Sequence, residues 1–161
     1  MMKAYLAGPD VFRPDALAWA ASARALCAAH EVEALVPLDC TLTEAAQIYR
    51  HNLALIAQAD AVLANLDAFR GAEPDSGTCF EVGYAVALGK RVIGYLSQAT
   101  DNKQRVGNWQ GLPPVLREGQ LYDRDGWLVE DFGLSANLML AMPAQIVVGG
   151  LEAALRQLVQ R

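Results

Sequence analysis

The chain has 161 residues, 53% of them apolar, and its 13 Lys and Arg against 18 Asp and Glu leave a net charge of −5. This length predicts one domain over residues 1–161, and the apolar content excludes a disordered chain. The acidic balance argues against a protein that holds nucleic acid through its phosphate backbone.

Strand and helix patterns alternate from the N-terminus. A short apolar run at residues 4–7 stops at a Gly-Pro turn, as expected of a buried strand. A helical pattern follows over residues 14–30, with Pro14 in its first turn. We expect a second strand over 34–38 and a helix from Thr43, as N-cap, through Gln58.

The same alternation continues through the middle of the chain. A third strand is predicted over residues 61–66, a helix over 77–88 that ends at Gly89, and a fourth strand over 91–96. The strands are almost continuously apolar, which is typical of strands covered on both faces. The pattern predicts an α/β fold with a parallel sheet and helices on both faces.

Residues 97–127 are polar and weakly periodic, with two short strands indicated near Leu121 and Trp127. Long loops in compact domains are usually lids or binding loops, so this segment is a candidate wall of a site, with a disordered insert as the alternative. The chain is expected to end in a helix interrupted at Gly149 and Gly150 and finishing over 151–159.

No run of about 18 uncharged apolar residues occurs, so no membrane span is expected. The chain reaches Gly8 and Pro9 before the apolar part of a secretory signal could form, which predicts a cytoplasmic protein. Three cysteines without CxxC spacing and two histidines predict neither a disulfide scaffold nor a zinc site.

Polar residues follow the predicted strands: Gly8 and Asp10 after the first, Asp39 after the second, and Asp67 and Asp75 after the third. In an open parallel sheet, ligands gather outside the carboxyl ends of the strands. Several carboxylates at one rim repel one another, and a fold tolerates this most readily where function requires it. The alternative is that these loops are acidic only because they are solvated.

The segment from Asp75 to Glu81 is the sharpest local feature. Asp75 or Ser76 can cap the helix, and Gly77 lets the backbone approach a ligand closely. Because helical side chains lean toward the N-terminus, Glu81 is expected to point back over the helix opening, where the helix dipole would keep it ionised as a nucleophile. The alternative is an ordinary glutamate in solvent.

Motifs for other chemistry are absent from the sequence. There is no GxGxxG after a strand and no GxxxxGK[ST], and Asp75 would repel a phosphate. His30 at a helix end and His51 within a helix do not suggest a Ser-His-Asp arrangement.

Four segments, in the same order, together resemble the nucleoside 2-deoxyribosyltransferase family. They are YLAGPDVF at residues 5–12, ADAVLANLDAFRG at 59–71, DSGTCFEVGYA at 75–85, and EDFG with NLML between 130 and 140. The resemblance covers nearly the whole chain except the loop around residues 97–120.

The resemblance implies a flavodoxin-like sheet and an enzyme that moves 2-deoxyribose between nucleobases. Glu81 would attack the anomeric carbon, release the first base and hold the sugar as an ester until a second base attacks. Asp67 matches the aspartate that exchanges a proton with the nucleobase, and Tyr5 matches the residue that hydrogen-bonds to the nucleophile.

Asp75 and, from a neighbouring subunit, Asn137 match the positions that hold the 5′-hydroxyl. The resemblance therefore implies a homo-oligomer with shared sites, deoxyribonucleosides and nucleobases as substrates, and no metal or organic cofactor. Met139 and its neighbours line either the interface or the base pocket, or are simply core.

Two alternatives remain. One is a hydrolase of 2′-deoxyribonucleoside 5′-monophosphates with the same nucleophile, against which Asp75 argues by repelling the phosphate. The other is a non-catalytic nucleoside-binding module on the same fold, against which the set of Glu81, Asp67 and Asp75 argues.

Overall fold

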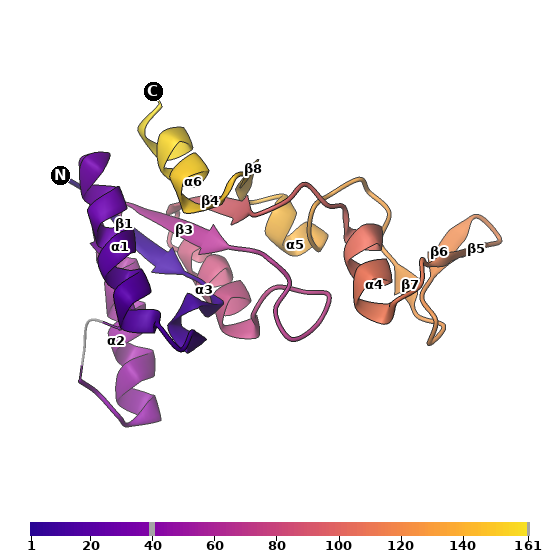
Figure 1. Cartoon of the computed structure of the whole chain (residues 1–161), viewed down its shortest axis with the longest axis horizontal. Coiled ribbons are helices and arrows are strands. Elements are labelled where there is room, and N and C mark those ends of the chain that lie inside the picture. Colours follow the sequence, from indigo (N-terminus) through magenta and orange to yellow (C-terminus); the bar gives the residue numbers. More distant parts are fainter. Residues whose placement is uncertain (39–40, 161) are drawn as a thin grey trace.

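The computed structural model describes residues 1–38 and 41–160 and contains a five-stranded parallel sheet (Figure 1). The strand order is β2-β1-β3-β4-β8, and every neighbouring pair runs parallel. The strands are β1 (Met2–Ala7), β2 (Val32–Leu35), β3 (Ala61–Asn65), β4 (Arg91–Leu96) and β8 (Gln145–Val148). This sheet confirms the predicted flavodoxin-like α/β fold.

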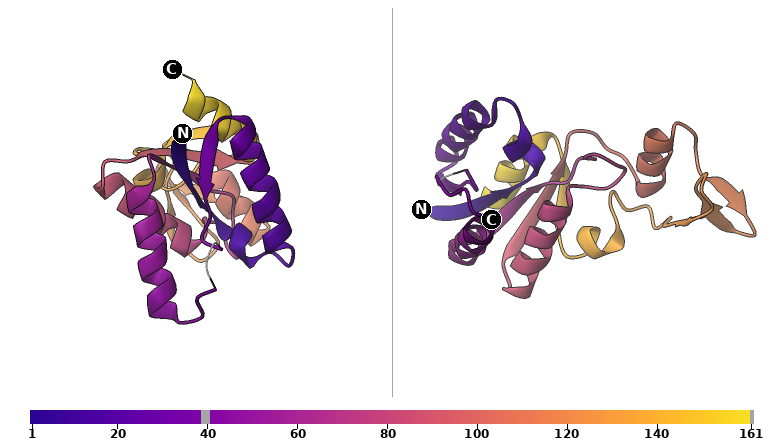
Figure 2. Two further views of the ribbon diagram at one scale, coloured as in Figure 1. Left: turned by 90° about the vertical axis from the view of Figure 1, so that its left-hand side faces the viewer. Right: turned by 90° about the horizontal axis from the view of Figure 1, so that it is seen from below.

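Helices cover both faces of the sheet (Figure 2). One face carries α1 (Ala16–Ala29) and α6 (Gly150–Val159), and the other carries α2 (Ala45–Gln58) and α3 (Ser76–Ala87). Because successive strand residues point to opposite faces, β1 sends Ala4 and Leu6 to the α1 side, and Tyr5 and Ala7 to the α3 side. The alternation therefore aims Tyr5 at the helix that contains Glu81.

Several predicted boundaries differ from the structure. A short 3-10 helix, η1 (Pro9–Phe12), follows β1, and α1 begins at Ala16 rather than Pro14. Strand β2 lies earlier than predicted and ends before Pro37, whose ring cannot donate to a ladder. Helix α2 has Glu44 as its N-cap instead of Thr43.

The C-terminal region was predicted wrongly as one interrupted helix. It contains the short helix α5 (Leu138–Ala141), strand β8 and then α6. Strand β8 has only four residues at the sheet edge, and so short an apolar run cannot be distinguished from a helix by periodicity. Gly149 and Gly150, with φ of 120° and 75°, make the turn from this strand into α6.

The polar segment after β4 is an ordered insertion that extends away from the sheet (Figure 1 and Figure 2). It contains α4 (Asn102–Gln110) and an antiparallel sheet of β5 (Val115–Arg117), β6 (Gln120–Tyr122) and β7 (Leu128–Val129). Strand β6 includes Leu121, as predicted, and β7 begins directly after Trp127. The polar helix α4 was missed, although a capping box between Asp101 and Gln104 begins it.

Among the described residues, no helix has the length and hydropathy that a bilayer crossing requires.

Candidate active site

Glu81 lies in the second turn of α3 and meets Tyr5 of β1. The buried Tyr5 hydroxyl donates a hydrogen bond to Glu81 Oε1 at 2.5 Å. Asp75 is the N-cap of α3, as the sequence suggested, and its Oδ2 accepts from the Thr78 backbone N at 3.0 Å and from Thr78 Oγ1 at 3.2 Å. The cap and the Tyr5 contact together fix the start of α3 and the carboxylate above it.

Burial is the largest influence on the pKa of Glu81. Burial raises the pKa of Glu81 to about 7, while the Tyr5 hydrogen bond opposes this rise and the charge of Asp75 adds to it. The sequence predicted a carboxylate that stays ionised with the help of the helix dipole, whereas a pKa of about 7 leaves Glu81 only partly ionised at neutral pH. Burial, followed by the charge of Glu81, raises the pKa of Tyr5, so its hydroxyl stays a donor.

Glu81 lines a cavity of about 400 Å³, hereafter the Glu81 cavity, a size typical of small-molecule sites. Its wall is mostly apolar and includes no Lys or Arg among the described residues; it is formed by Gly8, Val11, Phe12, Pro37, Leu38, Leu42, Ile48, Asn52, Asp75, Gly77 and Glu81. A Cβ on Gly8 would lie 2.8 Å from Asn65 Cβ, so this close approach requires glycine. Asp39, also predicted at this rim, lies outside the described residues.

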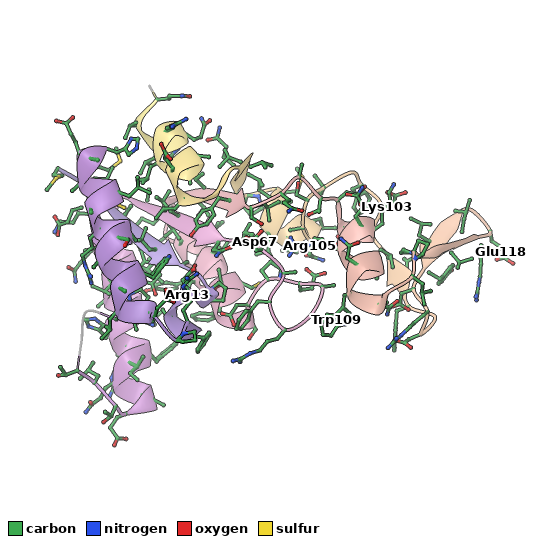
Figure 3. All side chains as sticks on the ribbon, in the orientation of Figure 1. Arg13, Asp67, Lys103, Arg105, Trp109 and Glu118 are labelled. Carbon is green, nitrogen blue, oxygen red and sulfur yellow. The ribbon has the colours of Figure 1, made fainter. Side chains whose placement is uncertain are left out.

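Asp67 does not line the Glu81 cavity. It lines a second cavity of about 540 Å³, hereafter the Arg105 cavity, together with residues that include Arg70, Ser97, Arg105 and Trp109. Asp67 Oδ1 accepts hydrogen bonds from Ser97 N at 2.9 Å and Ser97 Oγ at 3.1 Å. Figure 3 shows Asp67, Arg105 and Trp109 in the region between the main sheet and α4.

Asn137 and Met139 lie at the start of α5, outside the Glu81 cavity of the same chain. Asn137 Oδ1 accepts from Met139 N at 3.0 Å, and Asn137 Nδ2 donates to Glu130 Oε1 at 2.8 Å. Met139 is 73% exposed, so the alternative that it is core is wrong, whereas its neighbour Leu140 is buried.

The family model for nucleoside 2-deoxyribosyltransferases matches residues 4–139. The chain belongs to this family. A 2-desoxiribosyltransferase from Leishmania mexicana is 36% identical, with 99% of this chain and 97% of that chain covered and a TM-score of 0.81. A curated relative, an uncharacterized protein of Schizosaccharomyces pombe, is 28% identical over 157 residues, with 84% of this chain and 73% of the relative covered.

Two more distant structures share the fold with this family member. A 2-deoxyribosyltransferase from Bacillus psychrosaccharolyticus is 19% identical, with 73% of this chain and 87% of that chain covered and a TM-score of 0.50. A CMP N-glycosidase from Clostridium botulinum is 14% identical, with 97% of each chain covered and a TM-score of 0.55.

The sequence analysis missed Asn52 and Phe12 as site residues of this deoxyribosyltransferase family member. Asn52 of α2 lines the Glu81 cavity, and its buried Oδ1 has no partner within the described part of the chain. One cue was available, because Asn52 lies four residues before the buried Ile56 and so shares its helix face. Phe12 stacks on Phe69, with ring centroids 5.7 Å apart.

No three His, Cys, Asp or Glu side chains gather as a metal site within residues 1–38 and 41–160.

Proposed function

We propose that this protein exchanges nucleobases on 2′-deoxyribonucleosides through a covalent deoxyribosyl ester on Glu81. The observation that carries the proposal is the Glu81 carboxylate, held by the buried Tyr5 hydroxyl at 2.5 Å in a cavity of about 400 Å³. The family and the name of the Leishmania mexicana protein support the same reaction.

The chemistry follows from the two oxygens of Glu81. Tyr5 occupies Oε1, which leaves Oε2 to attack the anomeric carbon as the bond to the first base breaks. The base departs with the electron pair of that bond and takes up a proton. A second base then attacks the same carbon, the ester bond breaks, and the Glu81 carboxylate is restored.

Asp75 is positioned to recognise the sugar. Its Oδ2 is engaged by Thr78, which leaves Oδ1 as an acceptor for a hydroxyl such as the 5′-hydroxyl. The same carboxylate would repel a 5′-phosphate, and this favours nucleosides over the 5′-monophosphates that the alternative hydrolase would cleave. We assign the activity to cytoplasmic salvage, without a nucleic-acid or membrane partner.

We further propose that a neighbouring subunit supplies Asn137 and Met139 in a homo-oligomer. Both residues lie outside the cavity of their own chain, and the exposed Met139 side chain offers an apolar contact to another copy. The family resemblance supports the shared arrangement.

Two residues compete for the contact with the nucleobase. Asn52 is within the Glu81 cavity and has an unpaired amide oxygen, whereas Asp67 serves the base only if the substrate reaches the Arg105 cavity. Asn52→Leu should raise KM for the base about tenfold, the loss expected for one buried hydrogen bond.

If Asp67 exchanges the proton, Asp67→Asn should slow purine transfer and change its pH dependence; an unchanged rate and profile would remove Asp67 from the mechanism.

A product assay tests the proposed function. Deoxyinosine incubated with free adenine should yield deoxyadenosine in the absence of phosphate, and Glu81→Gln should yield none. Parallel reactions with deoxyinosine 5′-monophosphate test the hydrolase alternative. The proposal is wrong if no pair of bases exchanges, or if the monophosphate is cleaved faster than the nucleoside.

A further inference from the structure

A second cavity, the Arg105 cavity, is lined by none of Tyr5, Asp75 and Glu81, the residues proposed for the attack on the sugar and for its recognition. The Arg105 cavity of about 540 Å³ is formed by three segments: residues 67–71 after β3, residues 97–100 after β4, and the second half of α4. It therefore lies at the carboxyl ends of two neighbouring strands, where parallel sheets place their ligands.

The side chains that line the two cavities carry net charges of opposite sign. Asp75 and Glu81 line the Glu81 cavity, and no Lys or Arg is found among its described lining residues. Arg70 and Arg105 line the second cavity against one carboxylate, Asp67, and one oxygen of that carboxylate is already engaged by Ser97. An anion is therefore attracted to the Arg105 cavity and repelled from the Glu81 cavity.

The guanidinium of Arg70 is already positioned to bind an anion. Its guanidinium carbon lies 4.7 Å from the ring centroid of Phe69 and 5.3 Å from that of Phe12, and its φ of 55° is in the left-handed region. No ion pair of Arg70 with a carboxylate occurs within the described residues. A stacked guanidinium loses little freedom on binding, so its donors are available for a phosphate.

The buried side chain of Arg105 is a second, independent indication of an anion site. The residue is only 4% exposed; its Nε donates to Ala72 O at 2.9 Å, and its Nη1 donates to Ser135 O at 3.3 Å. The third nitrogen, Nη2, has no partner in the described part of the chain. The charges of Glu73 and Asp67 favour the charged guanidinium, but no ion pair of Arg105 occurs within the described residues. An anion bound in the adjoining cavity would give the buried Nη2 a partner and reduce the cost of burying it.

The same cavity has a surface for a flat ring. Trp109 lines it and is 61% exposed, and Gln98 and Asn108 line the same cavity with amides that can donate to and accept from a ring edge. We propose that the Arg105 cavity binds a mononucleotide, with the base against Trp109 and the phosphate toward Arg70 and Arg105.

Binding of a mononucleotide in the Arg105 cavity should affect the Glu81 cavity. The Arg70 guanidinium lies over Phe12, which lines the Glu81 cavity, and the loop that carries Asp67 ends at Asp75. A mononucleotide that draws Arg70 away from Phe12 should therefore alter base exchange without competing with the nucleoside.

Fluorescence of Trp109 tests the proposal in the full-length wild-type protein. Titration with deoxyguanosine 5′-monophosphate should give a saturable signal that is lost in Trp109→Phe, with the nucleotide recovered intact. Arg70→Met should weaken binding about tenfold or more, measured by calorimetry, because one charged contact is removed. Arg124→Met is the matched control, because Arg124 is an exposed arginine of the insertion that pairs with Asp125 and does not line the Arg105 cavity, so its loss should leave the affinity unchanged.

Two further titrations determine which groups of the nucleotide the Arg105 cavity recognises. Deoxyguanosine and inorganic phosphate should each bind more weakly than the mononucleotide, because each lacks one of the two recognised groups. The proposal is overturned if no saturable binding occurs, if Arg70→Met binds as tightly as wild type, or if deoxyguanosine binds as tightly as its monophosphate. It is equally overturned if the nucleotide is cleaved or if Asp67→Asn abolishes exchange, since either result would assign the cavity to the reaction. The binding outcomes are independent of whether wild-type protein exchanges bases, whereas the Asp67→Asn outcome applies only if it does.

Discussion

At the scale of single residues, the site depends on one hydrogen bond between β1 and α3. In the proposed reaction Glu81 must be ionised to attack the sugar, yet its surroundings favour the neutral acid and bring its pKa to about 7. The Tyr5 hydroxyl offsets part of this burial by donating to the carboxylate. We therefore expect the exchange rate to rise with pH through about 7 as Glu81 loses its proton.

Removing the Tyr5 hydroxyl should move this pH dependence. The hydrogen bond lowers the pKa of Glu81, so Tyr5→Phe should raise that pKa and shift the acid limb of the rate profile upward by about one pH unit. The measurement is the exchange rate from pH 5 to pH 9. Tyr84→Phe, a change elsewhere on α3 that does not touch the cavity, should leave the limb in place; an unmoved limb in Tyr5→Phe would contradict the role of Tyr5.

The burial of Glu81 also has a consequence for stability. Its pKa is raised from 4.5 to about 7 in the folded protein, so the folded state holds the proton more tightly than the unfolded state. The cost of the buried charge is absent below pH 4.5, grows as the pH rises toward 7, and is complete above 7. Glu81→Gln should thus match wild type in stability at pH 4 and exceed it at pH 8 by on the order of 2 kcal/mol.

Urea unfolding at the two pH values measures this difference, and the same preparation should show no base exchange. An equal stability at pH 8 would mean that the carboxylate is solvated in the folded protein. Retained exchange would place the nucleophile on another residue.

At the scale of elements, the sequence predicted best those strands and helix starts whose own residues show a clear apolar run or a capping side chain. Strands β1 to β4 and the capped start of α3 follow from apolar runs and from Asp75, which is why Glu81 could be placed. Strand β8 and helix α4 were missed because the first is a short edge strand and the second has a polar surface. The separation of Asp67 from Glu81 into two cavities depends on how loops fold in space, and no spacing along the chain reports that.

Helix α4 illustrates what the missed elements contribute. It is tied to the segment before α5 by Asn102 N to Leu134 O at 2.9 Å, by the Lys103 and Asp131 ion pair at 3.0 Å, and by Arg105 to Ser135 O. Arg105 also binds Ala72, in the loop that leads to Asp75. One buried side chain thus joins the insertion, the loop before α3 and the segment that carries Asn137.

Arg105→Met should loosen this junction. Two backbone carbonyls lose their donor, at a cost of about 1–3 kcal/mol each if they stay unpaired, so amide hydrogen exchange over residues 131–137 should accelerate and base exchange should slow. Arg91→Met is the matched control, because Arg91 also donates to two backbone carbonyls, Leu158 O and Gln157 O, but at α6; it donates in addition to Gln145 Oε1. If both variants show the same base exchange and the same protection over 131–137, Arg105 has only a general structural role.

At the scale of the whole molecule, the sheet with α3 and the start of α5 supply different parts of the proposed site. Tyr5, Asp75 and Glu81 come from the sheet and α3, whereas Asn137 is presented on α5 next to the exposed Met139. Asn137 does not line the cavity of its own chain, so in the proposed arrangement a second copy would supply it. The strongest test of that arrangement uses two variants that are each inactive.

Glu81→Gln removes the proposed nucleophile, and Asn137→Ala removes the residue proposed to complete the site of the neighbouring subunit. In a mixed dimer of the two variants, one site has both defects and the other has neither, so remixing should restore on the order of a quarter of wild-type exchange. Native mass spectrometry would verify that subunits have mixed, and each variant incubated alone is the control. Mixed oligomers without recovered activity would show that each chain builds its site from its own residues.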